Sequence, residues 1–451
     1  MSTFLMQDTI IALSTPTGQS ALAVIRITGN KAIDISDLIF TGKKPLNTSP
    51  GYSLHYGTLK DGSQTIDEVM LSLFRGPHSF TGEDTVEISC HGSNYITKRI
   101  LELFIDKGVR LAKPGEFTQR AFLNGKLDLS QAEAVADLIA SGNATAHKLA
   151  LKQLKGAVSS EIADLREQLL RFAALIELEL DFSTEDVEFA DRSELIALIQ
   201  TIQERINPLI ASFKIGNAVK EGYPVAIIGM PNVGKSTLLN TLLQEEKAIV
   251  TDIAGTTRDI IEDEMLIRGM SFRFIDTAGI RETNDVVESI GIERSRQAIR
   301  NAALVLFVYD GSEKTEDFNR LMDELNLGDK RWLAVHNKSD LNNSNILDKE
   351  IKISAKQQHG IELLKDKIWE AAGGEKLDSN DVMLTNHRHY EALISTNNAL
   401  DLVLKGLEEG ISGELLALDI RIALDHLGSI TGEISSDEVL GAIFSKFCIG
   451  K

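Results

Sequence analysis

The chain has 451 residues, enough for about three globular domains. Its 47 basic and 66 acidic residues give a formal net charge of −19, which argues against a surface that wraps nucleic acid broadly. Two cysteines, Cys90 and Cys448, are too few for a disulfide framework and indicate a reducing compartment, so we expect a cytoplasmic protein. We find neither a signal peptide nor an apolar run long enough to span a membrane.

Residues 1–118 are predicted to form a mixed α/β domain. The apolar pattern predicts strands at residues 9–13, 21–27, 67–74 and 85–89, and helices at residues 31–39 and 95–107. Arg26 and Glu87 alternate with apolar neighbours on two of these strands. The pattern alone favours exposed strand charges for both residues.

The pattern then becomes helical, with apolar residues at i, i+3, i+4 and i+7. It predicts helices over residues 131–140, 146–160, 161–180 and 193–213, and later over residues 387–407, 414–427 and 436–447. The simplest architecture is one helical domain, residues 119–219 and 374–451, into which residues 220–373 are inserted. The charged stretch 181–194 is expected to be a solvated connection.

The inserted segment opens with a phosphate-binding loop. Residues 223–240 read as a buried strand, a tight loop and a helix start, and the loop fits G-x-x-x-x-G-K-[ST]. Gly229 and Gly234 let the backbone turn its N–H groups toward phosphate oxygens, which the positive end of the following helix also attracts. Lys235 can reach the β- and γ-phosphates, and the Ser236 hydroxyl can ligate Mg²⁺. A glycine turn without function is the alternative, which the flanking strand and helix disfavour.

Three further motifs each follow a predicted strand, at residues 276–279, 337–340 and 354–356. Asp276 can hold the Mg²⁺ shell, and the N–H of Gly279 can sense the γ-phosphate. Asp340 can accept hydrogen bonds from N1–H and the 2-amino group of guanine, which adenine does not offer. The four motifs in this order predict a GTP-binding domain.

Several stretches resemble the MnmE (TrmE) family of tRNA-modification GTPases. Within the GTPase segment these are Asn232 and the run TDIAGTTRD at residues 251–259. The resemblance extends over nearly the whole chain. It includes FTGED at residues 80–84, PGEF at 114–117, KLDL at 126–129 and the terminal FCIGK at 447–451. The resemblance implies an α/β + α fold: an N-terminal mixed α/β dimerisation domain, a helical domain and an inserted Ras-like P-loop GTPase domain with a parallel sheet.

The resemblance also implies how GTP is hydrolysed. Many GTPases orient the attacking water with a Gln after Asp-x-x-Gly, but this chain has Ile280 there. Arg258 and Arg281 could supply an arginine finger, although surface salt bridging is the simpler interpretation of both. The family uses K⁺ instead. By resemblance, K⁺ is ligated by Asn232, the carbonyls of Thr251 and Ile253, and Thr256, while Mg²⁺ is held by Ser236 and Thr257.

The implied catalytic residues are Glu288, which positions water, together with Asn232 and Lys235. The alternatives are a helix N-terminal acid for Glu288 and a turn residue for Asn232. The expected GTP-binding residues are Asn232, Val233, Gly234, Lys235, Ser236, Thr237, Thr251, Asp252, Ile253, Ala254, Gly255, Thr256, Thr257, Asp276, Thr277, Ala278, Gly279, Asn337, Lys338, Ser339, Asp340, Ser354, Ala355 and Lys356.

The resemblance further implies a one-carbon carrier of the 5-formyl-tetrahydrofolate type, bound by Arg26, Glu87, Lys126 and Lys451. The role of Cys448 stays open between a buried structural thiol and a nucleophile. The implied assembly is a homodimer that joins an FAD-dependent MnmG (GidA)-type subunit in a heterotetramer and places a carboxymethylaminomethyl group on C5 of the wobble uridine (U34) of tRNA. The alternative function is a ribosome-assembly GTPase switch without covalent chemistry.

Overall fold

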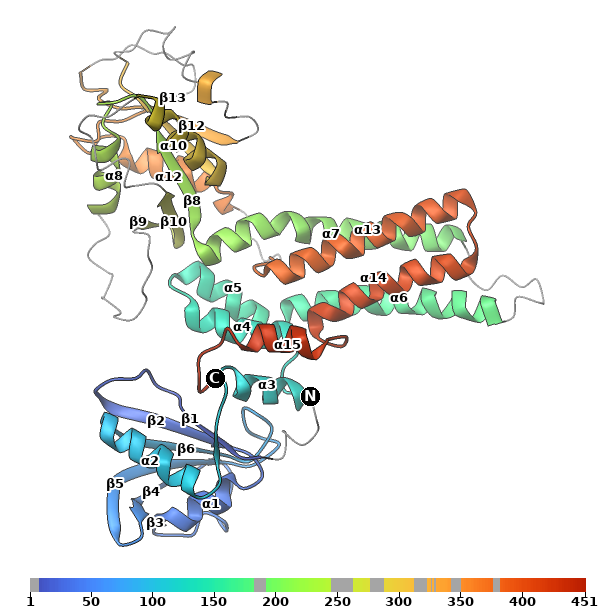
Figure 1. Ribbon diagram of the computed structural model, residues 1–451. Helices are drawn as coiled ribbons and strands as arrows, with labels where there is room; N and C mark the ends of the chain where they lie inside the picture. Colours follow the sequence, from blue (N-terminus) through green and yellow to red (C-terminus); the bar gives the residue numbers. More distant parts are fainter. Residues whose placement is uncertain are drawn as a thin grey trace. The chain divides into compact units, whose positions relative to one another are not determined.

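The computed structural model describes residues 8–181, 192–244, 263–275, 288–311, 323–325, 327, 330–341, 350–375 and 382–451 (Figure 1). The chain divides into two compact units. One comprises Met1–Ile139, Lys152–Ile202 and Ala392–Lys451, and the other comprises Ala140–Leu151 and Gln203–Glu391. Among the described residues, no helix combines the length and apolar character needed to cross a membrane. The domain boundaries expected at residues 118, 219 and 373 stay predictions.

The first unit contains a seven-stranded sheet in the order β3-β4-β5-β6-β2-β1-β7. One face is buried under α1 (Ala32–Ile39) and α2 (Asn94–Asp106), because alternate apolar side chains of the central strands point to that side. The strands are β1 (Ile10–Leu13), β2 (Ser20–Thr28), β3 (Phe40–Gly42), β4 (Ser53–Asp61), β5 (Gln64–Phe74), β6 (Thr85–Gly92) and β7 (Arg110–Leu111).

The sequence pattern missed part of this sheet. The edge strands β3 and β7 and the inner strand β4 were not expected, although β4 has nine residues. Its outward positions carry the large residues Leu54 and Tyr56, both exposed, so the strand lacks the alternation of apolar and polar residues that the prediction used. Helix α3 (Glu116–Leu123) was also not expected.

An ion-pair network joins the start of this unit to α3. Arg120, only 4% exposed, pairs with Asp8, Glu83 and Glu116, and Arg110 pairs with Asp8 and Glu116. Burial by itself would raise the pKa of Asp8 and of Glu116. Hydrogen bonds from Arg110 to both carboxylates, with a further one from Arg120 to Asp8, outweigh burial and hold both pKa values below their usual range.

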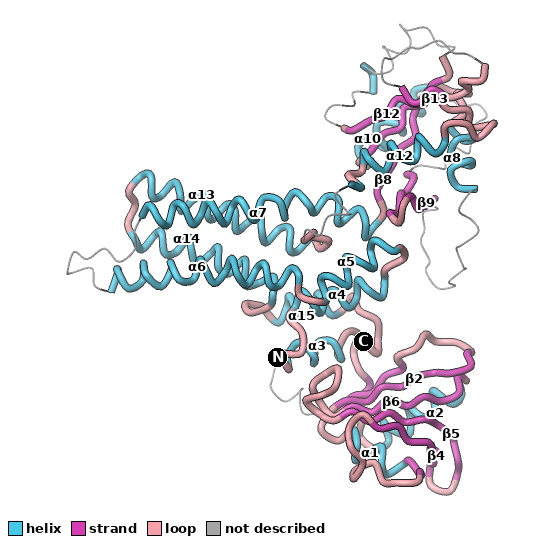
Figure 2. Tube along the Cα trace, turned by 180° about the vertical axis from the view of Figure 1, so that it is seen from behind, coloured by secondary structure: helices cyan, strands magenta, loops and turns pink. Residues whose placement is uncertain are grey.

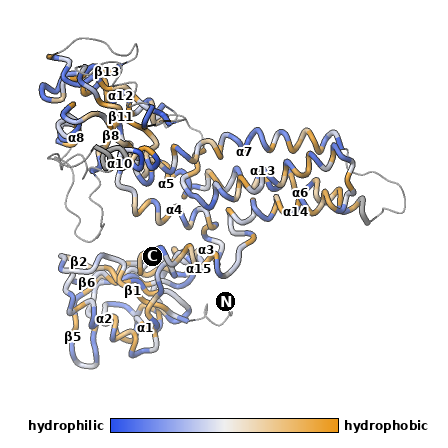
Figure 3. The backbone as a smooth tube through the Cα atoms, turned by 45° about the horizontal axis from the view of Figure 1, so that its top comes forward, coloured by the Kyte–Doolittle hydropathy of each residue, from blue (hydrophilic) through white to orange (hydrophobic). Residues whose placement is uncertain are grey.

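Helices complete the first unit. Helix α6 (Ala157–Asp181) packs against α14 (Gly413–Thr431), and the ion pair Arg421–Glu177 links them at the surface. Arg166 of α6 also pairs with Glu433, just after the end of α14. Hydrophobic and hydrophilic residues alternate along both helices in Figure 3, as amphipathic helices require. The predicted helix boundary at residues 160–161 was wrong. The break lies at a turn over residues 155–156, where Gly156 has a φ of +88°.

The remaining helices were mostly expected. Helix α15 ends at Phe444, before the predicted Phe447. Helix α7 continues past the predicted Phe213 to Glu221. The bounds are α4 (Leu129–Ala140), α5 (Ala144–Leu154), α7 (Arg192–Glu221), α13 (His387–Glu409) and α15 (Asp437–Phe444).

The second unit contains a six-stranded sheet in the order β13-β12-β11-β8-β10-β9, visible as a separate group of magenta strands in Figure 2. All neighbours pair in parallel except β9, which runs antiparallel to β10. Helices α8 (Lys235–Gln244) and α12 (Ile361–Ala371) contribute to the apolar cluster on one face, and α10 (Glu288–Asn301) contributes to the other. The strands are β8 (Tyr223–Ile228), β9 (Asp263–Ile267), β10 (Met270–Ile275), β11 (Leu304–Tyr309), β12 (Arg331–His336) and β13 (Glu350–Lys352). The expected fold class is confirmed.

Candidate nucleotide-binding site

The phosphate-binding loop lies at the carboxyl end of β8, the usual ligand position in a parallel sheet. Gly229 and Gly234 both have positive φ, +148° and +94°. A Cβ on Gly229 would collide with the Val308 carbonyl, so glycine is required there. Helix α8 begins at Lys235 and directs its free N–H groups at the loop. The local geometry is therefore that of an anion site.

The side chain of Lys235, the first residue of α8, reaches back to this loop. Its Nζ donates hydrogen bonds to the carbonyls of Gly229 and Met230, at 2.8 and 2.7 Å. Burial lowers the pKa of Lys235, because an ammonium ion loses hydration there. An anionic phosphate would replace these carbonyls with a stronger partner for the ammonium group. Ser236 and Thr237 follow in the first turn of α8.

Asn337 ties the phosphate loop to the predicted base-binding loops. Its Nδ2 donates to the carbonyl of Val233 at 2.8 Å, and its Oδ1 accepts from the N–H of Ala355 at 3.0 Å. Asn337 is 2% exposed, so both bonds are shielded from water. Thr241 adds a second tie, since its Oγ1 donates to the Ala355 carbonyl at 3.0 Å. The structure thus brings residues 232–237, 337–340 and 354–356 together.

Lys338 also connects its loop to the phosphate loop and to the end of β11. Its Nζ contacts the Asn232 carbonyl and the Asp310 carboxylate, each at 2.7 Å. Both Asn232 and Lys338 have left-handed backbones, with φ of +64° and +56°. Sequence reasoning missed Asp310. Its position directly after β11 was the available signal, because polar residues at strand ends of a parallel sheet face the ligand edge.

Asp340 lies at the end of the loop at residues 337–340, where its carboxylate can accept hydrogen bonds from a guanine ring. Its Oδ2 accepts a hydrogen bond from the Gln357 Nε2 at 3.1 Å, a contact that the sequence analysis also missed. The loop is held in place from behind, since Ser339 N–H donates to the Ile353 carbonyl at 3.1 Å. A carboxylate with free lone pairs, oriented by a neighbouring amide, suits base recognition.

Some expected site residues lie outside the described part of the chain. Glu288 is the first residue of α10, but its side chain lies outside the described part of the structure. Among the described residues, no group of three or more His, Cys, Asp or Glu side chains could hold a metal ion. The other expected residues outside the described part are Thr251, Asp252, Ile253, Ala254, Gly255, Thr256, Thr257, Asp276, Thr277, Ala278 and Gly279.

The expected folate residues all lie in the first unit. Arg26 and Glu87 face each other across β2 and β6, with Arg26 Nε 2.8 Å from Glu87 Oε1. The Arg26 guanidinium also lies 5.4 Å from the centre of the Phe80 ring and 5.7 Å from that of Phe117. Lys126 donates to the carbonyl of Pro77, in the same loop as Phe80, at 3.0 Å.

The C-terminal segment packs on the N-terminal sheet. The Ser14 hydroxyl donates to the Gly450 carbonyl at 3.3 Å, which places Lys451 near the end of β1. Gly115 N–H donates to the Cys448 carbonyl at 3.4 Å, so two motifs far apart in sequence are adjacent. The Cys448 side chain is exposed, and the structural interpretation of a buried thiol does not hold for it. Cys90 is the buried thiol, and burial raises its pKa to about 11.

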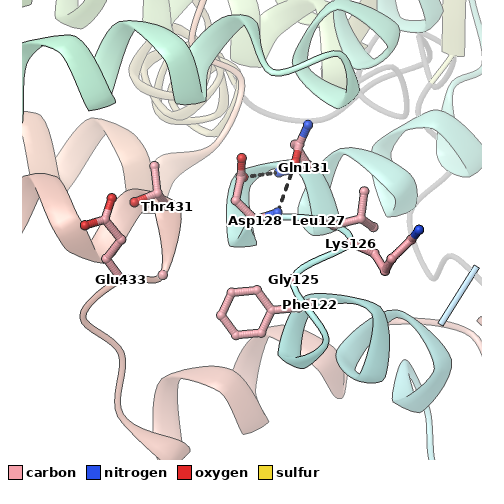
Figure 4. A pocket seen from close by; sticks show the side chains of 9 residues that line it. Phe122, Gly125, Lys126, Leu127, Asp128, Gln131, Thr431 and Glu433 are labelled. Carbon is pink, nitrogen blue, oxygen red and sulfur yellow. Dashed lines mark hydrogen bonds between the residues drawn. The ribbon is translucent and has the colours of Figure 1, made fainter. Parts of the chain in front are cut away.

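A cavity of about 410 Å³ adjoins Lys126 (Figure 4). Its lining includes Asp128 and Gln131, which hydrogen-bond each other's backbone N–H groups at 2.8 and 3.0 Å. Glu433, on the opposite wall, pairs with Arg166 at 2.6 Å. These polar groups are engaged within the protein, so the cavity offers few free groups for a ligand.

The strand, glycine loop and helix, joined through Asn337 to a second loop that ends in Asp340, define a guanine-nucleotide-binding domain of the P-loop class. Comparisons with known proteins agree. The family model described as the MnmE helical domain matches residues 129–448, and that described as the GTP-binding protein TrmE N-terminus matches residues 9–126.

Three relatives carry the name tRNA modification GTPase MnmE. The protein from Cytophaga hutchinsonii is 52% identical, with 98% of each chain covered. The protein from Flavobacterium johnsoniae is 51% identical with 99% of each chain covered, and that from Flavobacterium psychrophilum is 50% identical with 98% of this chain and 99% of its own covered. The chain belongs to the MnmE family of tRNA modification GTPases.

Proposed function

We propose that the chain hydrolyses GTP within a complex that installs a carboxymethylaminomethyl group on C5 of the wobble uridine of tRNA. The observation that carries the GTPase part is the Asn337 bridge. It links the carbonyl of Val233 in the phosphate loop to the N–H of Ala355 in a base loop, at 2.8 and 3.0 Å. One nucleotide would then contact both loops at once. The tRNA part follows from the family and from the names of the relatives.

The described residues fit the two cations expected with GTP. Ser236, in the first turn of α8, offers a hydroxyl oxygen for Mg²⁺, and Asn232 offers an amide oxygen for K⁺. Bound beside the phosphates, these ions would offset the negative charge that develops during hydrolysis. Lys235 would hold the β- and γ-phosphates in line. Thr251, Ile253, Thr256 and Thr257 complete the proposed ligand sets, and Glu288 is proposed to position water.

The described residues also suit a reduced folate. The Arg26–Glu87 pair presents a guanidinium and a carboxylate beside the exposed ring of Phe80, a setting for the polar edge and flat face of a pterin. Lys126 and Lys451 are proposed to bind carboxylates of the folate tail. When bound, a 5-formyl-tetrahydrofolate-type carrier would supply the one-carbon unit.

We further propose a cytoplasmic homodimer that works with an FAD-dependent MnmG-type subunit. The net charge of −19 supports a partner protein as the source of much of the tRNA contact, because a strongly acidic chain repels phosphates. Family membership disfavours the alternative of a ribosome-assembly switch, which nothing in the described residues specifically supports.

The test is nucleoside mass spectrometry of bulk tRNA from three strains: wild type, a deletion, and a strain carrying only Lys235→Ala. Loss of C5-modified wobble uridines in both altered strains is expected. Arg421→Ala, at an exposed pair remote in sequence from both proposed sites, is the matched control and should keep the modification. Normal modification together with incomplete ribosomal subunits would overturn the proposal and favour the switch.

A further inference from the structure

Three buried polar side chains lie directly behind the base-binding loops. Tyr309 is the last residue of β11, His336 is the last residue of β12, and Glu350 is the first residue of β13. These are three adjacent parallel strands. The exposed fractions are 1% for Tyr309 and, for the side chains alone, 0% for His336 and 4% for Glu350. Apolar residues would fill this space at lower desolvation cost, so the cluster calls for an explanation.

The Glu350 carboxylate is the centre of the cluster. One oxygen accepts a hydrogen bond from the Tyr309 hydroxyl, and the other lies 3.2 Å from His336 Nδ1. The rings of Tyr309 and His336 stack at 5.1 Å, and the Lys352 ammonium lies 3.9 Å from the carboxylate. His336 Nε2 is buried and has no hydrogen-bond partner among the described residues. Because a carboxylate oxygen only accepts hydrogen bonds, His336 Nδ1 is the donor in this contact.

The same residues hold the base loops through their backbones. The Tyr309 carbonyl accepts the N–H of Asn337 at 2.7 Å, and the His336 carbonyl accepts the N–H of Ile353 at 2.8 Å. His336 is bonded directly to Asn337, and Ile353 directly precedes the loop that starts at Ser354. Tyr309 and His336 thus each bind the start of a base loop through the backbone and contact Glu350 through the side chain.

We propose that Tyr309, His336 and Glu350 are positioning residues that set the register of the two guanine-binding loops, and through it the affinity and selectivity for the base. The Glu350 carboxylate spans three strands at the edge where both loops emerge, so loss of a donor would let β13 shift relative to β12. Such a shift would move Ala355 relative to Asn337, and Asp340 relative to the base. This inference rests on the proposed function, because it concerns the same GTP site.

The test compares GTP with ITP, which lacks the 2-amino group, in competition against a fluorescent GTP analogue on the full chain. His336→Leu removes the donor and should weaken GTP binding at least tenfold, about 1.4 kcal/mol. The ratio of GTP to ITP affinity should fall at least threefold, because a displaced Asp340 no longer accepts a hydrogen bond from the 2-amino group. His336→Gln, which retains an N–H donor, should recover most of the ratio.

Val335→Ala is the matched control. Val335 is buried beside His336 on the same strand, but it faces the other side of the sheet. It should lower the melting temperature while leaving the affinity ratio unchanged. Tyr309→Phe removes one hydroxyl and should lower the ratio of GTP to ITP affinity two- to threefold. This variant keeps the test decisive if His336→Leu fails to fold.

An unchanged GTP-to-ITP ratio in every folded cluster variant would overturn the inference. With ATP added as a third competitor in the same titration, failure of the wild-type protein to prefer GTP over ATP would instead refute the proposed function. The two failures are therefore distinguishable in one experiment.

Discussion

Asn337→Ala is the perturbation that most directly tests the bridge between the phosphate and base loops. The substitution removes two buried hydrogen bonds, each worth about 1 kcal/mol net. It also leaves the Ala355 N–H buried without its partner, which costs about 1–3 kcal/mol. The total is roughly 3–5 kcal/mol, and even its lower end corresponds to at least about a hundredfold loss of GTP affinity. Because the apolar sheet core is untouched, the domain should stay folded.

The assay is titration of a fluorescent GTP analogue, with circular dichroism and thermal melting to establish folding. Thr241→Val is the matched control, since it removes one buried hydrogen bond to the same loop residue, Ala355, without touching the phosphate loop. It should lower GTP affinity less than about threefold, because the Asn337 bridge remains. A folded Asn337→Ala protein that binds GTP within threefold of wild type would refute this reasoning.

Three further predictions follow from contacts described above. Arg120→Met should lower the free energy of unfolding by about 3 kcal/mol in urea, because Asp8, Glu83 and Glu116 lose this guanidinium and Arg110 alone remains to compensate three carboxylates. The lowered pKa values of Asp8 and Glu116 mean that their stabilisation is present at neutral pH and lost as pH falls through the folded values. Urea midpoints measured from pH 7 to 3 should therefore fall less steeply in Arg120→Met than in wild type. Asp340→Asn should shift preference from GTP toward XTP by at least about tenfold in competition binding, since an amide can donate to the xanthine 2-oxo group. Gln357→Ala should weaken GTP binding about two- to fivefold by the same titration, as expected for one exposed hydrogen bond.

The local sequence pattern was sufficient for elements with strong periodicity. Strands were predicted at the start of residues 223–240 and directly before the motifs at residues 276–279 and 337–340, and β8, β10 and β12 lie at these places. Continuous apolar runs of this kind suit strands covered by helices on both faces. The phosphate loop was equally predictable, because its glycines and lysine are fixed by phosphate geometry at constant spacing.

Long-range pairing was not predictable from the pattern. Arg26 and Glu87 were interpreted from their own strands as exposed charges, but they form an ion pair 61 residues apart, with Arg26 only 16% exposed in its side chain. Nothing in either strand alone specifies the register that places them opposite each other. Asp310 and Gln357 were missed for the same reason, since their partners lie 28 and 17 residues away.

The two buried polar clusters differ in what their disruption should do. The N-terminal cluster has Arg110 and Arg120 among three carboxylates, so removing one guanidinium leaves charge uncompensated and should mainly lower the stability of that unit. The carboxylate of Glu350 accepts from Tyr309 and His336 and has a lysine at 3.9 Å, so loss of one donor leaves other partners. A shift of loop register should therefore precede unfolding there, and the consequence should appear first in base selectivity.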